Sequence, residues 1–218
     1  MELLGKFIFA TRKTLLCSLV FGILLCLIVI IEGNESGFLW FNATITPIFG
    51  KPAAVITQFG EWYVMVFLLV CCLWISTRKF ITVIIAWVIG ACLSWMFKLW
   101  IFDGLARPLV YFGRQNIPLQ LVDGVQVHSY NTFPSGHTIT AFSSILLFRF
   151  VFTNLKNWQE FILVFFAIAC GLSRIILVQH WPQDVLGGMV LGLLAGYLGV
   201  YLGFKFCLEK TISEPITK

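Results

Sequence analysis

The sequence predicts an all-α polytopic membrane protein, folded as a bundle of six transmembrane helices. Of its 218 residues, 59% are hydrophobic and only 11% are charged, whereas soluble domains carry about 25% charged residues. So few charges cannot cover the surface of a water-soluble globule, which leaves lipid as the solvent. A membrane-spanning helix needs about 20 mostly apolar residues. Six such runs lie near residues 14–31, 58–76, 80–101, 138–154, 160–178 and 185–204.

The first apolar run also has a feature of a secretory signal peptide, because Lys6, Arg12 and Lys13 precede it. Three observations argue against cleavage. The run is long for a signal-peptide core, no small-residue cleavage site follows it, and five more apolar runs come after it. We therefore expect residues 14–31 to remain as the first membrane span.

The basic residues predict which way the bundle crosses the membrane. Six spans place both termini on the same side, and ten of the fifteen Lys and Arg residues then fall on that side. Cytoplasmic loops carry the excess of basic residues in membrane proteins, so this side is predicted to be cytoplasmic. The ten residues are Lys6, Arg12, Lys13, Arg78, Lys79, Arg149, Lys156, Lys205, Lys210 and Lys218. The net charge of +5 is therefore interpreted as a sign of topology and not of nucleic-acid binding.

We expect one membrane-embedded domain, residues 1–218, without internal repeats or low-complexity segments. Its two long connections, near 32–57 and 102–137, lie on the outer face. The first contains aromatic residues, which collect at membrane interfaces, so it forms either a short interfacial helix or an irregular loop packed on the bundle. The cysteines lie within or at the ends of apolar runs and are interpreted as packing residues. They are Cys17, Cys26, Cys71, Cys72, Cys92, Cys170 and Cys207.

The outer face also collects the ionisable residues that lie close to the spans. All three histidines, His128, His137 and His180, fall on this side, together with Arg107 and Arg174. Ionisable groups beside an apolar span are costly to keep there, which makes them candidates for function. Because three separate span ends deliver them to one region, the clustering is stronger evidence than any single residue.

This cluster has the groups that phosphoryl transfer requires. The phosphate must be held by positive groups and by backbone N–H donors, and a helix N-terminus supplies such donors. The run at 135–137, Ser-Gly-His, opens the fourth span, and Gly136 lets the backbone approach phosphate oxygens closely. Arg107 and Arg174 can bind phosphate oxygens through paired N–H groups, and Lys98 adds a point charge.

The nucleophile is predicted from a second short pattern, in which His180 stands four residues before Asp184 with Pro182 between them. Proline suits the first position of a helix, so the sixth span is expected to start there. Asp184 would then lie in the first turn and hydrogen-bond one ring nitrogen of His180. That bond fixes the tautomer and raises the basicity of the other nitrogen. His137 could protonate the leaving oxygen as a general acid.

Together these residues resemble the three-part signature of the phosphatidic acid phosphatase type 2 and haloperoxidase superfamily. The second part matches the Pro-Ser-Gly-His run at 134–137. The third part matches Ser-Arg at 173–174, followed by five residues, His180, three residues and Asp184. The combination of both parts is highly specific, whereas a tetrapeptide alone would not be.

The first part of the signature fits less closely. In the family it is a lysine, six residues and then Arg-Pro, but here eight residues separate Lys98 from Arg107. Either the two extra residues loop out, or Lys98 lies deeper and another cation, such as Arg114, takes part. The resemblance covers about 98–184, and the six-span layout extends it over the whole chain.

The resemblance implies a covalent phosphohistidine at His180, oriented by Asp184, with His137 as the acid. It implies neither a metal nor another cofactor. Membrane members of this family are six-helix bundles with the site at the outer interface, which agrees with the placement from the charge count. The residues that it implies as phosphate-binding are Lys98, Arg107, Ser135, Gly136 and Arg174.

These observations predict a metal-independent phosphatase that hydrolyses a phosphate monoester or diphosphate of a membrane lipid. Candidate substrates are undecaprenyl diphosphate, a lipid A phosphate, phosphatidylglycerophosphate and phosphatidic acid. The compact, short-tailed chain is typical of a bacterial protein, which favours the first two. It also favours the inner (cytoplasmic) membrane, with cytoplasmic termini and the site on the periplasmic face.

Three other functions fit parts of the pattern. A lipid phosphotransferase would form the same phosphohistidine but pass the phosphate to another lipid. A vanadium haloperoxidase has similar motifs, but six membrane spans argue against it. A non-catalytic lipid-binding or transport protein could lose the nucleophile without penalty, and the retention of His137, His180 and Asp184 argues against that function.

Overall fold

The fold was obtained as a computed structural model that describes residues 2–213, with the side chains of residues 5–205. Every regular element among these residues is helical. The side chains of Cys207 and Lys210, and all of Lys218, lie outside the described part. The elements in chain order are α1 (Glu2–Ala10), α2 (Arg12–Ile31), α3 (Asn34–Trp40), η1 (Phe41–Ile45), α4 (Thr46–Ile56), η2 (Thr57–Gly60), α5 (Trp62–Ile75), α6 (Thr77–Met96), η3 (Phe97–Ile101), α7 (Pro108–Arg114), α8 (Gly136–Val151), α9 (Asn157–Ile176) and α10 (Pro182–Ser213).

Each of the six predicted spans corresponds to a helix of the bundle, namely α2, α5, α6, α8, α9 or α10. Among the described residues, four helices are long and apolar enough to cross a bilayer by themselves: Arg12–Ile31, Thr77–Ile101, Asn157–Ile176 and Pro182–Lys205. A fifth span would combine Asn34–Gly60 with Trp62–Ile75, which are bent by 44° against each other. The remaining helix, α8, has 16 residues. The chain is thus an all-helical integral membrane protein, and the count of six spans stays a prediction.

The central helix of the bundle is α10, which packs against both α8 and α6. Glycines on α10 make this close approach possible. A Cβ atom on Gly192 would lie 2.6 Å from the carbonyl oxygen of Ile139 in α8, and one on Gly199 would lie 2.4 Å from the Cβ of Ala86 in α6. Real Cβ atoms do not approach that closely, so glycine is required here. Small residues at helix interfaces serve the same purpose in membrane proteins generally.

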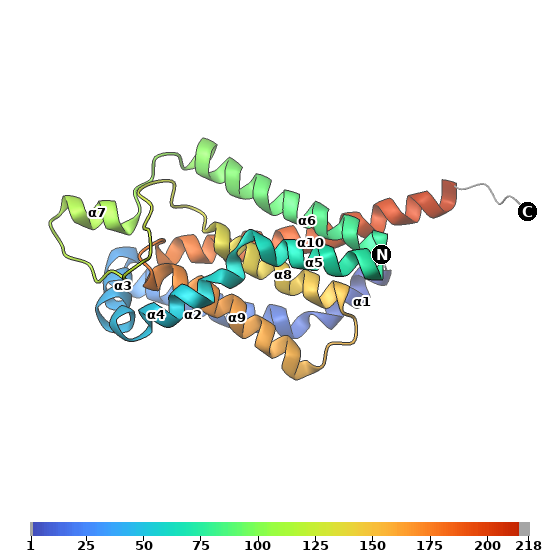
Figure 1. The fold of residues 1–218 in the computed structure, drawn as a ribbon, viewed down its shortest axis with the longest axis horizontal. Coiled ribbons are helices and arrows are strands. Elements are labelled where there is room, and N and C mark those ends of the chain that lie inside the picture. The colour runs from blue at the N-terminus through green and yellow to red at the C-terminus, as the bar shows by residue number, and fades with distance from the viewer. Residues whose placement is uncertain (1, 214–218) are drawn as a thin grey trace, which may run out of the picture.

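The two ends of the bundle differ in structure (Figure 1). One end holds α1 and the α5–α6 and α8–α9 connections, where Lys79 Nζ donates to the carbonyl oxygen of Val151 over 2.8 Å. The other end holds α3, α4 and α7 together with the long loop before α8. The segment 32–57 is helical, and Thr46 Oγ1 donates to the carbonyl oxygen of Ile176 at the end of α9. Of the two predicted forms for this segment, the structure therefore has the helical one.

Candidate active site

The start of α10 brings His180 and Asp184 together. Pro182 is the first helical residue, as predicted, and Asp184 lies in the first turn. The Asp184 carboxylate accepts the backbone N–H of Trp181 through Oδ2 at 2.9 Å. A carboxylate three residues into a helix commonly satisfies the residue before the first turn in this way. The same Oδ2 lies 3.3 Å from His180 Nδ1, and the two side chains are only 2% and 0% exposed.

Thr132 completes this buried pair, although the sequence did not predict it. Its hydroxyl donates to Asp184 Oδ2 and lies 3.5 Å from His180 Nδ1. Thr132 reaches this place because Phe133, which follows it, packs its ring on α10. A Cβ atom on Gly187 would lie 2.5 Å from that ring. Threonine two residues before a proline is too common for its spacing to have indicated this contact.

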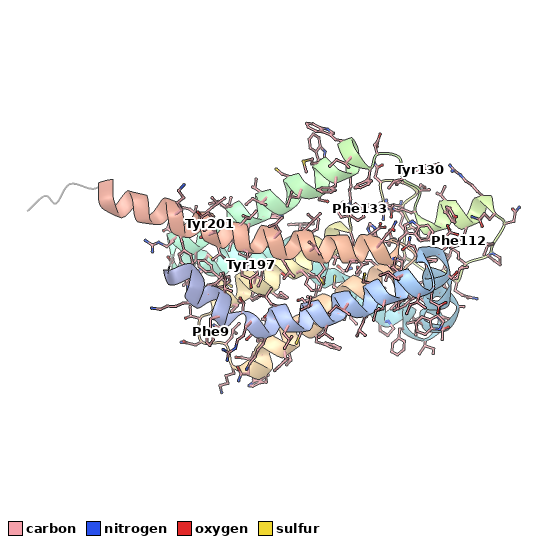
Figure 2. The ribbon with its side chains drawn as sticks, turned by 180° about the vertical axis from the view of Figure 1, so that it is seen from behind. Phe9, Phe112, Tyr130, Phe133, Tyr197 and Tyr201 are labelled. Carbon is pink, nitrogen blue, oxygen red and sulfur yellow. The ribbon has the colours of Figure 1, made fainter. Side chains whose placement is uncertain are left out.

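Arg107 lies against the other nitrogen of His180. Its guanidinium donates through Nε to the carbonyl oxygen of Tyr130 at 2.9 Å and through Nη1 to that of Gln179 at 2.8 Å. Nη1 also lies 3.4 Å from His180 Nε2. Figure 2 shows Tyr130 and Phe133 at the same end of the molecule, with Tyr197 and Tyr201 at the opposite end. The backbone carbonyls of Tyr130 and Gln179 thus hold the Arg107 guanidinium in place.

The electrostatic surroundings of His180 favour its neutral form. Burial lowers the pKa of the ring well below its usual value, and the nearby charges of Arg107, Arg174 and Lys98 lower it further. Removing an imidazolium from water is costly, and like charges add to that cost. A neutral ring whose Nδ1–H donates to Asp184 keeps the lone pair of Nε2 available on the side of Arg107.

Arg174, near the end of α9, lines a polar cavity of about 340 Å³. Its Nη1 donates to Thr57 Oγ1 over 2.6 Å, whereas the buried Nε has no hydrogen-bond partner among the described residues. Polar groups that are buried without a partner are uncommon in proteins. An anion in the cavity would accept a hydrogen bond from Arg174 Nε. His128 and His137 line the same cavity.

His137 lies in the first turn of α8, and its Nε2 is 2.9 Å from Glu61 Oε1. Glu61 precedes α5 and was not predicted as a site residue. Seventy-six residues separate it from His137, so no local spacing in the sequence links the two. The candidate site therefore contains a second carboxylate–histidine pair.

The start of α8, where backbone donors to phosphate are predicted, is held by hydrogen bonds of Ser135. Ser135 precedes the helix and is completely buried, with its Oγ accepting from the Thr138 hydroxyl at 2.8 Å and from the Thr138 N–H at 3.4 Å. Its own N–H donates to the carbonyl oxygen of Asp184 over 3.1 Å. The motif at 134–137 is thereby fixed to α10. A Cβ atom on Gly136 would lie 3.7 Å from Lys98 Nζ.

This position of Lys98 favours the alternative in which the extra residues loop out. Lys98 lies in η3, a π-helical turn, which contains more residues per turn than an α-helix. The wider turn and the following bend around Gly104 absorb the extra residues, so the amine still reaches Gly136. Arg114 instead lies at the end of α7, where its Nη2 contacts the exposed Tyr130 hydroxyl at 3.3 Å. Lys98 thus lies beside Gly136 despite the longer spacing, and its role in phosphate binding stays a prediction.

A model of the PAP2 superfamily matches residues 104–206. This part of the chain is therefore similar to the PAP2 superfamily. Two bacterial relatives are similar over this region. Lipid A 1-phosphatase of Porphyromonas gingivalis is 34% identical over 117 residues, which are 52% of this chain and 25% of that protein. Undecaprenyl-diphosphatase BcrC of Bacillus subtilis is 37% identical over 94 residues, which are 41% of this chain and 45% of that protein. The chain thus spans less than half the length of either relative.

A solved structure has a fold similar to that of this chain. The crystal structure of LpxE from Aquifex aeolicus aligns with a TM-score of 0.63 and 22% identity, over 75% of this chain and 92% of that chain. At this identity the likeness establishes the fold alone. Most of the predicted site residues lie within the matched PAP2 region, whereas Lys98 and Glu61 precede it. These two residues reach the site only through the packing of α5 and α6.

Proposed function

We propose that this chain is a membrane phosphatase that hydrolyses a phosphate monoester or diphosphate of a lipid through a phosphohistidine at His180. The observation that carries the proposal is the buried His180–Asp184 pair, in which His180 Nε2 faces away from Asp184 and lies 3.4 Å from Arg107 Nη1. A neutral imidazole next to a fixed cation is suited to attack an anionic phosphate, because the cation balances the charge of the substrate.

In the first step, Nε2 of His180 attacks phosphorus and forms a P–N bond. The P–O bond to the lipid breaks, its electron pair goes to the lipid oxygen, and His137 donates a proton to that oxygen. Arg107, Arg174 and Lys98 bind the phosphoryl oxygens, together with the N–H groups at the start of α8. Asp184 stabilises the positive ring of His180, since its carboxylate lies 3.3 Å from Nδ1.

In the second step, water attacks the same phosphorus. His137, now neutral, accepts the proton of that water as the new P–O bond forms. The P–N bond breaks, its electron pair returns to Nε2 of His180, and inorganic phosphate leaves. His137 is then protonated and His180 is neutral, so the site has returned to its starting state.

The substrate is proposed to be a lipid whose phosphate lies at the membrane interface. The names of the two relatives favour a lipid A phosphate or undecaprenyl diphosphate over a glycerolipid. We place residues 1–218 in the inner membrane as one phosphatase domain. In this placement the basic end of the bundle is cytoplasmic, and the end with His137 and His180 is periplasmic.

The test is phosphate release by the purified protein in detergent, with a chelator present and a panel of lipid phosphates and diphosphates as substrates. His180→Ala is expected to lose at least about 1,000-fold of the wild-type rate, because the covalent route is removed. His128→Ala, which removes a histidine from the same cavity but not the predicted nucleophile, is expected to keep most of the rate.

Acid-labile ³²P-labelled protein is expected from wild type quenched during turnover and not from His180→Ala. Release of phosphate by His180→Ala at the wild-type rate would refute the nucleophile. Phosphate that appears only when a second lipid is added would show a phosphotransferase instead of a hydrolase.

A further inference from the structure

Glu61 occupies an unusual place in the chain, at the break between two helical segments. Residues Asn34–Gly60 and Trp62–Ile75 meet there at an angle of 44°. Glu61 has an extended backbone, with φ −82° and ψ 159°, and it precedes the first residue of α5. A break within an apolar segment is tolerated where the backbone lines a polar cavity, and Glu61 lines one.

The residue before Glu61 shows that the chain is pressed onto His137 at this point. A Cβ atom on Gly60 would lie 2.6 Å from the Cβ of His137, 2.7 Å from its carbonyl oxygen and 2.8 Å from Cys170 Sγ. Only glycine allows the backbone to come this close. The close approach therefore places the Glu61 carboxylate within reach of the His137 ring.

The Glu61 carboxylate does not serve its own helix. The residue before a helix often uses its side chain to accept an N–H of the first turn, and Ser, Thr, Asp and Asn are preferred for this role. Glu61 makes no such hydrogen bond to α5. Its Oε1 instead lies 2.9 Å from His137 Nε2. The position is thus a poor choice for helix capping and a good one for contact with His137.

The pair of Glu61 and His137 separates two spaces. On one side is the polar cavity of about 340 Å³ that also holds Arg174. On the other side is a groove of about 220 Å³ between α5, α6 and α8, which runs from Gly136 past Ser94 to apolar residues of the membrane region. Both spaces are lined by Glu61 and His137. A lipid whose phosphate lies beside Arg174 and whose chain lies in this groove would have its bridging oxygen next to His137.

From this arrangement we propose that Glu61 is the positioning residue of the general acid. It holds the His137 ring at the boundary between phosphate and lipid chain and orients the ring toward the leaving oxygen. This inference rests on the proposed phosphatase function. Glu61 itself transfers no proton, because the proton given to the lipid oxygen comes from His137 and is replaced by the proton of the attacking water.

The inference is tested by comparing leaving groups. Two substrates with the same hydrocarbon tail are used, an alkyl phosphate and a nitrophenyl phosphate. An alkoxide needs a proton in order to leave, whereas a nitrophenolate leaves without one. In Glu61→Gln, kcat for the alkyl phosphate is expected to fall by about 10- to 100-fold, a fraction of what a general acid supplies. KM and the rate with the nitrophenyl phosphate are expected to change by less than a few-fold.

The matched control is Glu35→Gln, which removes another outer-face glutamate that accepts a hydrogen bond, from the Tyr111 hydroxyl. It is expected to behave like wild type with both substrates. The double variant His137→Ala/Glu61→Gln is expected to be no slower on the alkyl phosphate than His137→Ala, because both changes remove the same function.

Three results would overturn the inference. An equal loss on both substrates would indicate that Glu61 only supports the fold or the phosphate site. An unchanged rate with both substrates would show that His137 acts without Glu61. Additive losses in the double variant would show that the two residues act separately. In each case the proposed function would stand as long as wild type releases phosphate and His180→Ala does not.

Discussion

The two carboxylate–histidine pairs of the site differ in how the chain brings their members together. His180 and Asp184 stand four residues apart at one helix start, and both are almost completely buried. His137 and Glu61 stand 76 residues apart, and their side chains are 25% and 33% exposed. Local helix geometry forms the first pair, and packing between distant segments forms the second.

This difference matches the two chemical roles that we propose. A nucleophile that forms a covalent bond benefits from a fixed, water-excluded position, which the start of α10 provides. A residue that donates a proton to a lipid oxygen and then accepts one from water benefits from a position at the edge of the cavity. The buried pair is therefore expected to tolerate change least.

The largest expected effect comes from Asp184→Asn, which keeps the size of the side chain but removes its charge. The neutral Asn side chain has no carboxylate to face His180 Nδ1. It also has a single oxygen left to accept hydrogen bonds from both His180 and Thr132. We expect kcat to fall by about 100- to 10,000-fold, more than in Glu61→Gln. The measurement is kcat on the same alkyl phosphate. A smaller loss than that of Glu61→Gln would reverse the ranking of the two pairs.

The next effect is on stability, and it depends on pH. Burial, followed by Arg107, Arg174 and Lys98, lowers the pKa of His180 well below its usual value of 6.5. Above pH 6.5 the ring is neutral in both the folded and the unfolded chain. Below pH 6.5 only the unfolded chain takes up the proton, so the free energy of unfolding falls as the pH falls. The slope is at most about 1.4 kcal/mol per pH unit until the folded pKa is reached.

The measurement is thermal unfolding in detergent between pH 7 and pH 5, for wild type and His180→Gln. Wild type is expected to lose more stability than the variant over this range. His128→Gln removes an exposed histidine and is expected to follow wild type closely. Parallel curves for wild type and His180→Gln would mean that the folded protein protonates His180 as readily as the unfolded chain.

The same contrast explains what could be predicted from the sequence. The His180–Asp184 contact follows from a spacing of four residues and a proline, and the start of α8 follows from a Ser-Gly pair, because both are local patterns. The six helical segments follow from runs of apolar residues. Each of these features needs only the chain within a few turns of itself.

Glu61 and Thr132 could not be predicted, because each reaches the site through contacts between segments distant in sequence. Glu61 meets His137 only where the chain bends ahead of α5, and an isolated Glu at a span boundary looks like an ordinary interfacial residue. The place of Lys98 was open for a related reason. A π-helical turn changes the number of residues per turn, and no sequence pattern in η3 reveals it.

The smallest expected effect comes from Gly60→Ala, which tests the long-range pair through its backbone. The added Cβ atom would lie 2.6 Å from the Cβ of His137 and 2.8 Å from Cys170 Sγ, so the segment must move away. We expect kcat for the alkyl phosphate to fall by about 10-fold, at the lower end of the loss expected for Glu61→Gln. The nitrophenyl phosphate rate should change little, because the cations and His180 are not displaced.

The matched control is Gly113→Ala in α7, where nothing lies within 4 Å of the new atom. If Gly60→Ala matched this control in kcat on both substrates, the contact between Glu61 and His137 would not depend on the close approach of the chain. Packing between distant segments would then hold that pair no less firmly than local helix geometry holds His180 and Asp184.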